Sequence, residues 1–189
     1  MTKQVVFALA LLVTLVAFGF TITRIIRFFS LTRKGFPVKN IGKRIGIMLK
    51  VAFGQTKIFR RPIIGFLHAM VFWGFCLIIF GSIEMVIDGL FGLEKSLSVL
   101  GWFHDFIMAA GDIFAPIIAI AIVVFLIRRV FLHIKRFEGI EMKKISHLDA
   151  NIALTLILLL MISLMGMNTA YVSWCHSLGK EIHGVYPVS

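Results

Sequence analysis

The stretch that decides the fold is RRPIIGFLHAMVFWGF, at residues 60–75. It begins with the basic pair Arg60 and Arg61 and continues as an apolar segment that Pro62 can start as a helix, because the first turn does not need the N–H that proline lacks. His68 follows about 10 Å further along that helix, at ~1.5 Å per residue. That depth is roughly a third of a hydrocarbon layer of ~30 Å. An ionisable residue there predicts a functional site, and a neutral imidazole is a common ligand of haem iron.

The composition is that of an integral membrane protein. Of the 189 residues, 59% are hydrophobic and 15% are charged, whereas soluble domains are about half apolar and a quarter charged. A formal net charge of +11 would suggest nucleic acid for a soluble chain, but here the cations gather in two segments that border apolar runs, so we expect no nucleic-acid partner. The two cysteines, Cys76 and Cys175, are too few for an iron–sulfur cluster with four thiolate ligands.

Four apolar segments predict membrane-spanning helices at about 5–26, 62–87, 101–127 and 150–167. The first segment is longer than the apolar part of a signal peptide, and no small-residue cleavage site follows it, so we expect it to be retained. The fold class is therefore all-α, with a four-transmembrane-helix bundle forming a single membrane domain over residues 1–189 and a polar tail over 168–189.

The distribution of basic residues predicts the orientation in the membrane. Seventeen of the twenty Lys and Arg residues lie in 24–61 and 128–144, which places the loops 27–61 and 128–149 in the cytoplasm and both termini outside. Within the first loop, Ile41, Ile45, Met48 and Ala52 share one helical face. This pattern favours a helix lying among the headgroups of an anionic leaflet, and an ordinary cytoplasmic loop is the alternative.

Polar residues at membrane depth are the candidate site residues. His68 is the first candidate haem ligand, because Gly65 lies one turn before it and Phe72 and Phe75 follow on the same face, which predicts a slot for a flat macrocycle. A histidine that hydrogen-bonds to a neighbouring helix is the alternative. His147 lies at a similar depth before the fourth segment and is the candidate axial partner or, alternatively, a capping histidine.

Five further positions complete the set of candidate site residues. His104, at the outer start of the third segment, is a candidate ligand of a second haem. Asp112 lies near mid-membrane, where a carboxylate either pairs with a neighbouring helix or takes part in proton or quinone handling. His133 fits a solvated basic face, and the tail histidines His176 and His183 are weaker candidates.

Several short runs occur in the order seen in a known family. They are Phe53-Gly54-Gln55, Arg61-Pro62, Gly65-Phe66-Leu67-His68, Gly74-Phe75, Ile87-Asp88-Gly89, Phe91-Gly92, Ile127-Arg128-Arg129, Lys135-Arg136-Phe137, Met167-Asn168 and Tyr186-Pro187-Val188-Ser189. On these runs, which cover most of the chain, the sequence resembles the membrane domain of heterodisulfide-reductase-like (Fe-S)-binding oxidoreductases, which is similar to the nitrate reductase gamma subunit.

The resemblance implies b-type haem in a five-helix bundle that exchanges electrons with a quinone, either menaquinone or ubiquinone. It makes His68 the ligand on the second helix. The gamma subunit has another histidine ten residues later, where this chain has Ile78, so the expected partner is His147 or a histidine beyond Ser189. It also implies that the last family helix and a domain with [4Fe–4S] clusters lie on a missing segment or on a partner chain.

Together these expectations describe a multi-pass protein of the cytoplasmic (inner) membrane of a prokaryote. It would pass electrons between cytoplasmic iron–sulfur clusters and the membrane quinone pool, as part of a membrane-bound quinone-linked oxidoreductase. Its expected partners are membrane lipid, quinone, an iron–sulfur domain or subunit, and a soluble flavoprotein electron donor. The alternative is a haem-free membrane anchor for a cytoplasmic redox partner, in which His68 is only packed.

Overall fold

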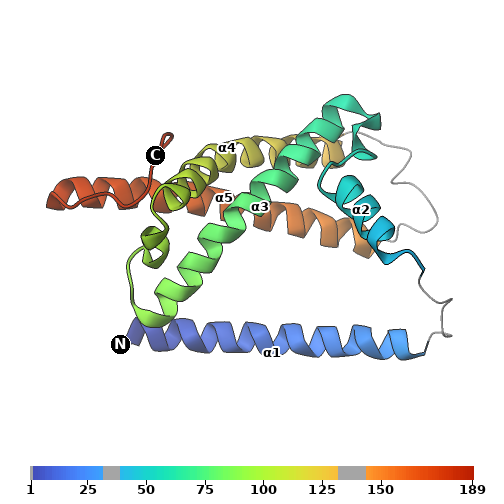
Figure 1. The fold of residues 1–189 in the computed structure, drawn as a ribbon, viewed down its shortest axis with the longest axis horizontal. Helices are drawn as coiled ribbons and strands as arrows, with labels where there is room; N and C mark the ends of the chain where they lie inside the picture. The colour runs from blue at the N-terminus through green and yellow to red at the C-terminus, as the bar shows by residue number, and fades with distance from the viewer. Residues whose placement is uncertain (1, 32–38, 132–143) are drawn as a thin grey trace. The chain divides into compact units, whose positions relative to one another are not determined.

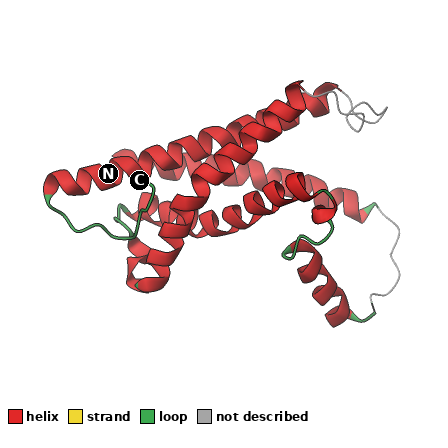
Figure 2. Cartoon of the chain, turned by 90° about the horizontal axis from the view of Figure 1, so that it is seen from above, coloured by secondary structure: helices red, strands yellow, loops and turns green. Residues whose placement is uncertain are grey.

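The computed structural model describes residues 2–31, 39–131 and 144–189. The predicted all-α fold is confirmed over these residues, because 85% of them are helical and none forms a strand. Figure 2 shows the loops of the described chain confined to the ends of helices. In chain order the helices (Figure 1) are α1 (Thr2–Ser30), α2 (Ile41–Ala52), the 3₁₀ helix η1 (Ile58–Arg60), α3 (Pro62–Phe91), the 3₁₀ helix η2 (Ser96–Leu100), α4 (Trp102–Phe131) and α5 (Lys144–Leu178).

Four of these helices are long and apolar enough to cross a membrane: α1, α3, α4 and the Leu148–Leu178 part of α5. This confirms the four predicted segments, although each helix continues beyond its apolar run. The difference is largest in α5, where the predicted polar tail from residue 168 is wrong as far as Leu178, because the helix continues to that residue. The hydroxyls of Thr169 and Ser177 donate to backbone carbonyls one turn earlier, at 2.9 and 2.8 Å, so polar side chains are satisfied within the helix.

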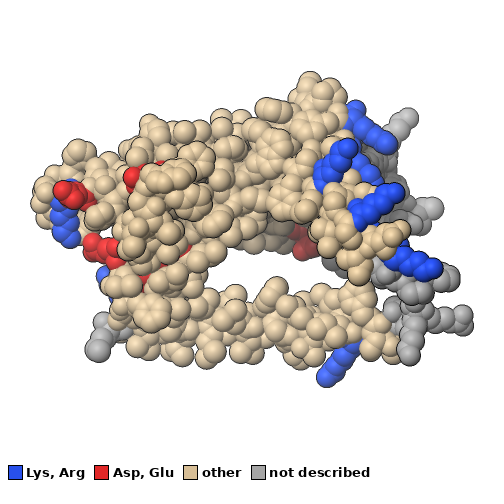
Figure 3. Space-filling model, in the orientation of Figure 1, with Lys and Arg blue, Asp and Glu red and all other residues tan. Residues whose placement is uncertain are grey.

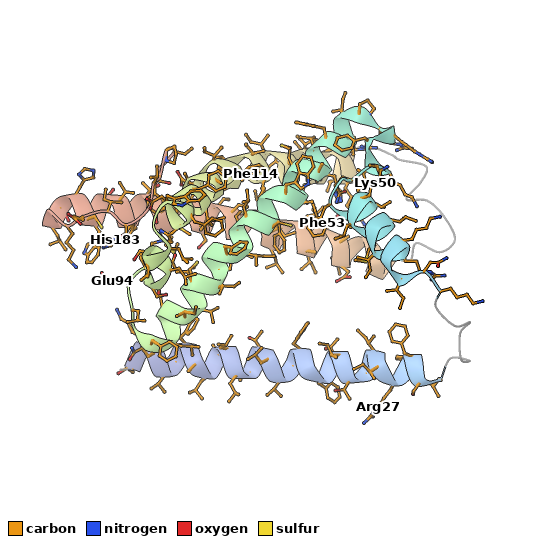
Figure 4. All side chains as sticks on the ribbon, viewed as in Figure 1. Arg27, Lys50, Phe53, Glu94, Phe114 and His183 are labelled. Carbon is orange, nitrogen blue, oxygen red and sulfur yellow. The ribbon has the colours of Figure 1, made fainter. Side chains whose placement is uncertain are left out.

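The basic segment before α3 contains the expected amphipathic helix. It is α2, which begins after Asn40, a residue in the left-handed conformation, and ends before Phe53. Figure 4 labels Lys50 on this helix and Phe53 just after it. Its place at a membrane surface stays a prediction.

The described contacts divide the chain into two compact units. The first comprises Met1–Gly54 and Ser82–Ser96, and the second comprises Gln55–Gly81 and Leu97–Ser189. Helix α3 contributes its beginning to the second unit and its end to the first.

In the first unit, α1 contacts the end of α3 through its own first turns. A side chain at Gly89 would meet the ring of Phe7, and one at Gly92 would meet the amide of Gln4, so both glycines allow the helices to approach closely. None of the residues of α1 is buried. Figure 3 shows an uncharged surface along α1 between its ends, as expected for a helix that lies against lipid.

The turn that follows α3 is built around Asp88. Gly92 adopts a positive φ of 68°, and its N–H donates to the carbonyl of Asp88 at 2.7 Å, which is the left-handed end that glycine favours after a helix. The Asp88 carboxylate then accepts the N–H groups of Lys95 and Ser96 at 2.9 and 3.1 Å. The Lys95 ammonium lies 3.8 Å from the carboxylate of Glu84, which is buried.

In the second unit, α4 and α5 pack side by side (Figure 1). Their core consists of Ala115, Ile118 and Ile122 from α4 and Met161 from α5. Helix α3 approaches α4 closely at Gly74, where an added Cβ would lie 2.6 Å from Phe114 and 2.8 Å from Ile118; Phe114 is labelled in Figure 4. Small residues at membrane helix contacts allow helices to approach this closely.

Candidate functional site

The first candidate site is a cavity of about 750 Å³ at the start of α3. It lies wholly within the second unit, and its lining comes from the segment before α3, the first turns of α3, the end of α4 and one residue of α5. The lining residues are Lys57, Ile58, Arg60, Arg61, Ile64, Gly65, His68, Phe125, Arg128, Arg129 and Leu154. The volume falls within the ~300–1,000 Å³ range of small-molecule sites.

His68 lies on the wall of this cavity. Helix α3 begins at Pro62 as predicted, which puts His68 about two turns into the helix. Its side chain is exposed, and its ring centroid lies 6.5 Å from that of Phe125 on α4, with the rings inclined by 52°. An imidazole on a cavity wall can bind a ligand there, and its role as a haem ligand stays a prediction.

The missing side chain at Gly65 has a packing role. A side chain there would collide with the backbone carbonyl of Ile58, so the glycine accommodates the backbone of η1 against α3. Gly65 also lines the cavity beside His68, and a macrocycle slot there stays a prediction. Periodicity along one helix does not reveal which backbone segment folds back onto it.

The aromatic wall also differs from the expectation. Phe72 is half-buried and Phe75 is exposed, and neither belongs to the described lining of the cavity. Phe125 from α4 and Leu154 from α5 line it instead. Sequence spacing missed both because neighbouring helices contribute them, and only contacts between helices could have identified them.

Five cations line the cavity, and its described lining contains no acidic residue. Arg128 and Arg129 are half-buried in the last turn of α4, where the partial negative charge of a helix C-terminus favours basic side chains. Lys57, Arg60 and Arg61 are exposed on the opposite segment. Figure 3 shows basic side chains gathered at the end of the view where α3 begins. The site suits a ligand with an apolar body and negatively charged groups.

These residues fit a haem. The imidazole of His68 is a haem-iron ligand type, Phe125 and Leu154 offer apolar packing, and the cations can pair with carboxylates. Among the described residues, no group of three or more His, Cys, Asp or Glu side chains gathers that could hold a metal ion. A porphyrin, by contrast, brings its own nitrogen donors and needs few ligands from the protein.

The second axial ligand stays a prediction. His147 lies in the first turns of α5, seven residues before the cavity residue Leu154. Its side chain lies outside the described residues, and so does the whole of His133. A pairing of His147 with His68 therefore stays a prediction.

His104 cannot share an iron with His68. It is buried in the first turn of α4, and its Nδ1 lies 3.6 Å from the carboxylate of Asp105. Phe125, which contacts His68, follows 21 residues later on this helix, or about 31 Å at ~1.5 Å per residue. The role of His104 as the ligand of a second haem stays a prediction. The tail histidine His183, labelled in Figure 4, is exposed.

The second candidate site is the carboxylate of Asp112, which is buried on α4. It accepts hydrogen bonds from the Asn168 side chain at 3.0 Å, the Val188 N–H at 2.7 Å, and the Ser189 N–H and hydroxyl at 3.1 and 2.6 Å. These bonds correspond to the structural alternative for this residue, a contact with a neighbouring helix. A part in proton or quinone handling stays a prediction.

The sequence reasoning missed the partners of Asp112 in the segment 179–189. That segment returns from the end of α5 and lies against it through Tyr171, whose ring is 5.8 Å from that of Tyr186 and whose hydroxyl accepts the His183 N–H at 3.2 Å. A side chain at Gly184 would lie 3.1 Å from Met108 of α4. The short polar residues at the end of the chain were the available signal, because a buried carboxylate requires donors.

Comparison with known proteins adds no assignment: no family model, no curated protein and no solved structure matches this chain. The function is therefore argued from the site.

Proposed function

We propose that this chain is the haem-b membrane domain of a quinone-linked oxidoreductase. The observation that supports it best is the exposed His68 imidazole on the wall of a cavity that combines apolar side chains with five cations. An ionisable residue within an apolar membrane helix indicates a functional site. The resemblance to the heterodisulfide-reductase-like family supports the same proposal.

Each part of the cavity has a role in this proposal. His68 binds the iron, Phe125 and Leu154 pack against the macrocycle, and Arg128 and Arg129 pair with its carboxylates. The bound group supplies one-electron transfer. The candidate that would supply a second ligand to the group is His147. The protein's own part is to hold the group in an apolar setting next to fixed positive charge, which favours the reduced state.

The predicted orientation in the membrane determines which partners each end of the helices can meet. The basic loops predict that the cavity end of α3 faces the cytoplasm of a prokaryote, with both termini outside. There it would meet [4Fe–4S] clusters on a further segment or a partner chain, which a soluble flavoprotein reduces or oxidises. On the other side of the reaction, the protein would exchange electrons with menaquinone or ubiquinone in the bilayer. Asp112 is the proposed residue for proton or quinone handling.

The alternative function is a haem-free anchor for a cytoplasmic redox partner. One observation favours it: the ring of Phe125 lies 6.5 Å from the ring of His68, so an aromatic contact already occupies one side of the imidazole. In this alternative His68 packs against α4, and the basic residues hold the membrane surface.

The deciding experiment is a reduced-minus-oxidised absorption spectrum of the purified chain, together with His68→Ala and the control His183→Ala. We expect sharp b-haem bands in the parent and in the control, and their loss in His68→Ala. Folded preparations without bands would leave the anchor function. Bands that survive His68→Ala but disappear in His104→Ala would move the haem to the other end of α4.

A further inference from the structure

The cavity at the start of α3 carries more positive charge than a haem requires. A b-type haem has two carboxylate groups, whereas five cations line this cavity. The half-buried pair Arg128 and Arg129 is sufficient for those two groups. Lys57, Arg60 and Arg61 are left, and all three are exposed just before or at the border of a helix that is apolar enough to cross a membrane.

We propose that Lys57, Arg60 and Arg61 bind the phosphate headgroup of one anionic phospholipid. The site is stoichiometric and saturable, which distinguishes it from a general attraction between basic loops and an anionic leaflet. It requires only that α3 crosses the membrane, and it does not depend on haem at His68.

The backbone that carries Arg60 and Arg61 is held against the start of α3. η1 ends at Arg60, and the N–H of Arg61 donates to the carbonyl of Ile58 at 3.3 Å. The carbonyl of Arg61 then accepts the N–H of Gly65 at 2.7 Å, so α3 starts immediately after it. A side chain at Gly65 would collide with Ile58, which keeps this turn against the helix. Guanidinium groups on a fixed turn match phosphate oxygens in pairs.

The surroundings of the cations favour an amphiphile over a soluble anion or an acidic protein. Phe59 precedes the arginine pair and Ile63 and Phe66 follow it, and their exposed fractions are 39, 75 and 52%. A phosphate at the cations would place acyl chains beside these side chains. A phospholipid therefore satisfies both the charge and the apolar surface, as is typical of basic pockets at the cytoplasmic ends of membrane helices.

The test titrates the full chain, purified in neutral detergent, with phosphatidylglycerol or phosphatidylcholine and counts bound lipids by native mass spectrometry. The test variant is Arg60→Gln/Arg61→Gln. The matched control is Arg24→Gln/Arg27→Gln, because this second exposed pair at the end of α1 lies outside the cavity lining. We expect one tight phosphatidylglycerol site in the parent. Its affinity should fall roughly 30-fold in the test variant and stay unchanged in the control, because each of the two arginines removed contributes about equally to the binding free energy.

Three outcomes would overturn the lipid site. They are equal binding of phosphatidylcholine, unchanged binding by Arg60→Gln/Arg61→Gln, or complete displacement of phosphatidylglycerol by inorganic phosphate, which would indicate a site for a free anion. Arg60→Lys/Arg61→Lys keeps the charge but not the paired donors, so it should bind phosphatidylglycerol more weakly than the parent and more tightly than Arg60→Gln/Arg61→Gln, an order that misfolding of the Gln variant would not by itself produce. Absorption spectra of the same samples separate the two proposals, because a preparation without haem bands that still binds phosphatidylglycerol contradicts only the haem proposal.

Discussion

The side-chain amide of Asn168 on α5 donates a 3.0 Å hydrogen bond to the carboxylate of Asp112 on α4, and both side chains are buried. The same carboxylate accepts the backbone N–H groups of Val188 and Ser189. In a membrane, polar groups away from water must be satisfied inside the protein. This carboxylate therefore joins two helices and the segment 179–189 of the second unit.

The bond between Asp112 and Asn168 is expected to stabilise the pairing of α4 with α5. A double-mutant cycle with Asp112→Ala and Asn168→Ala should give a coupling free energy of about 0.5–2 kcal/mol, the range for interhelical hydrogen bonds in membranes. The measurement is unfolding of the detergent-solubilised protein by sodium dodecyl sulfate. Asp149→Ala, at an exposed position of α5, is the control and should be additive with Asn168→Ala. A coupling indistinguishable from zero for Asp112 would contradict the contact.

The attachment of the C-terminal segment depends on the same carboxylate. Asp112→Ala should accelerate amide hydrogen exchange at Val188 and Ser189 roughly tenfold or more, because both N–H groups lose a charged acceptor. Hydrogen–deuterium exchange with mass spectrometry of the peptide over 182–189 measures this. Ser189→Ala removes only the hydroxyl donor and should have a smaller effect. Equal exchange in the parent and in Asp112→Ala would show that the segment is held by other contacts.

The contact of α3 with α4 at Gly74 predicts opposite effects for two glycine substitutions. Gly74→Ala places a Cβ 2.6 Å from Phe114 and should destabilise the protein by about 1–3 kcal/mol. Gly111→Ala, within α4, meets no atom within 4 Å and should stabilise the helix by up to about 1 kcal/mol. Thermal unfolding of both variants in the same detergent tests the pair, and a neutral or stabilising Gly74→Ala would rule out the close approach.

Lys95 predicts a dependence of stability on pH. Burial holds the pKa of its ammonium below the ordinary 10.5, and the charges of Glu84 and Asp88 only partly oppose this. The unfolded chain then binds the proton more tightly than the folded chain, so the free energy of unfolding should rise as the pH increases from the folded-state pKa toward 10.5.

The measurement is the unfolding midpoint of the parent and of Lys95→Met at a series of pH values from about 8 to 10.5. The rise in the unfolding midpoint from the lowest to the highest pH should be smaller in Lys95→Met than in the parent. Lys50→Met replaces an exposed lysine on α2 and should leave the rise unchanged. A rise of the same size in Lys95→Met would assign it to other groups.

Much of the helical architecture was predictable from local patterns. Apolar runs longer than a bilayer requires predicted all four long helices, Pro62 marked the start of α3, and the spacing of Ile41, Ile45 and Met48 predicted α2. Helix ends were less predictable, because hydrogen bonding along a helix continues where hydrophobicity stops. Thus α5 extends past Asn168 to Leu178.

The candidate site was predictable only in part. His68 stood out because an ionisable residue in an apolar run is costly, and the structure places it at a cavity. Its neighbours were not evident, because Phe125 lies 57 positions away in sequence and Leu154 lies on another helix. The packing of Gly65 against the backbone of Ile58 was not evident for the same reason.

The sequence by itself determined which segments are helical and which residues are too polar for lipid, since both follow from composition and periodicity along a continuous stretch. Only the tertiary structure decided what those polar residues contact. The donors to Asp112 come from Asn168, 56 positions later, and from Val188 and Ser189, 76 and 77 positions later. Contacts over such separations depend on how the helices pack, and packing depends on side chains from several segments at once.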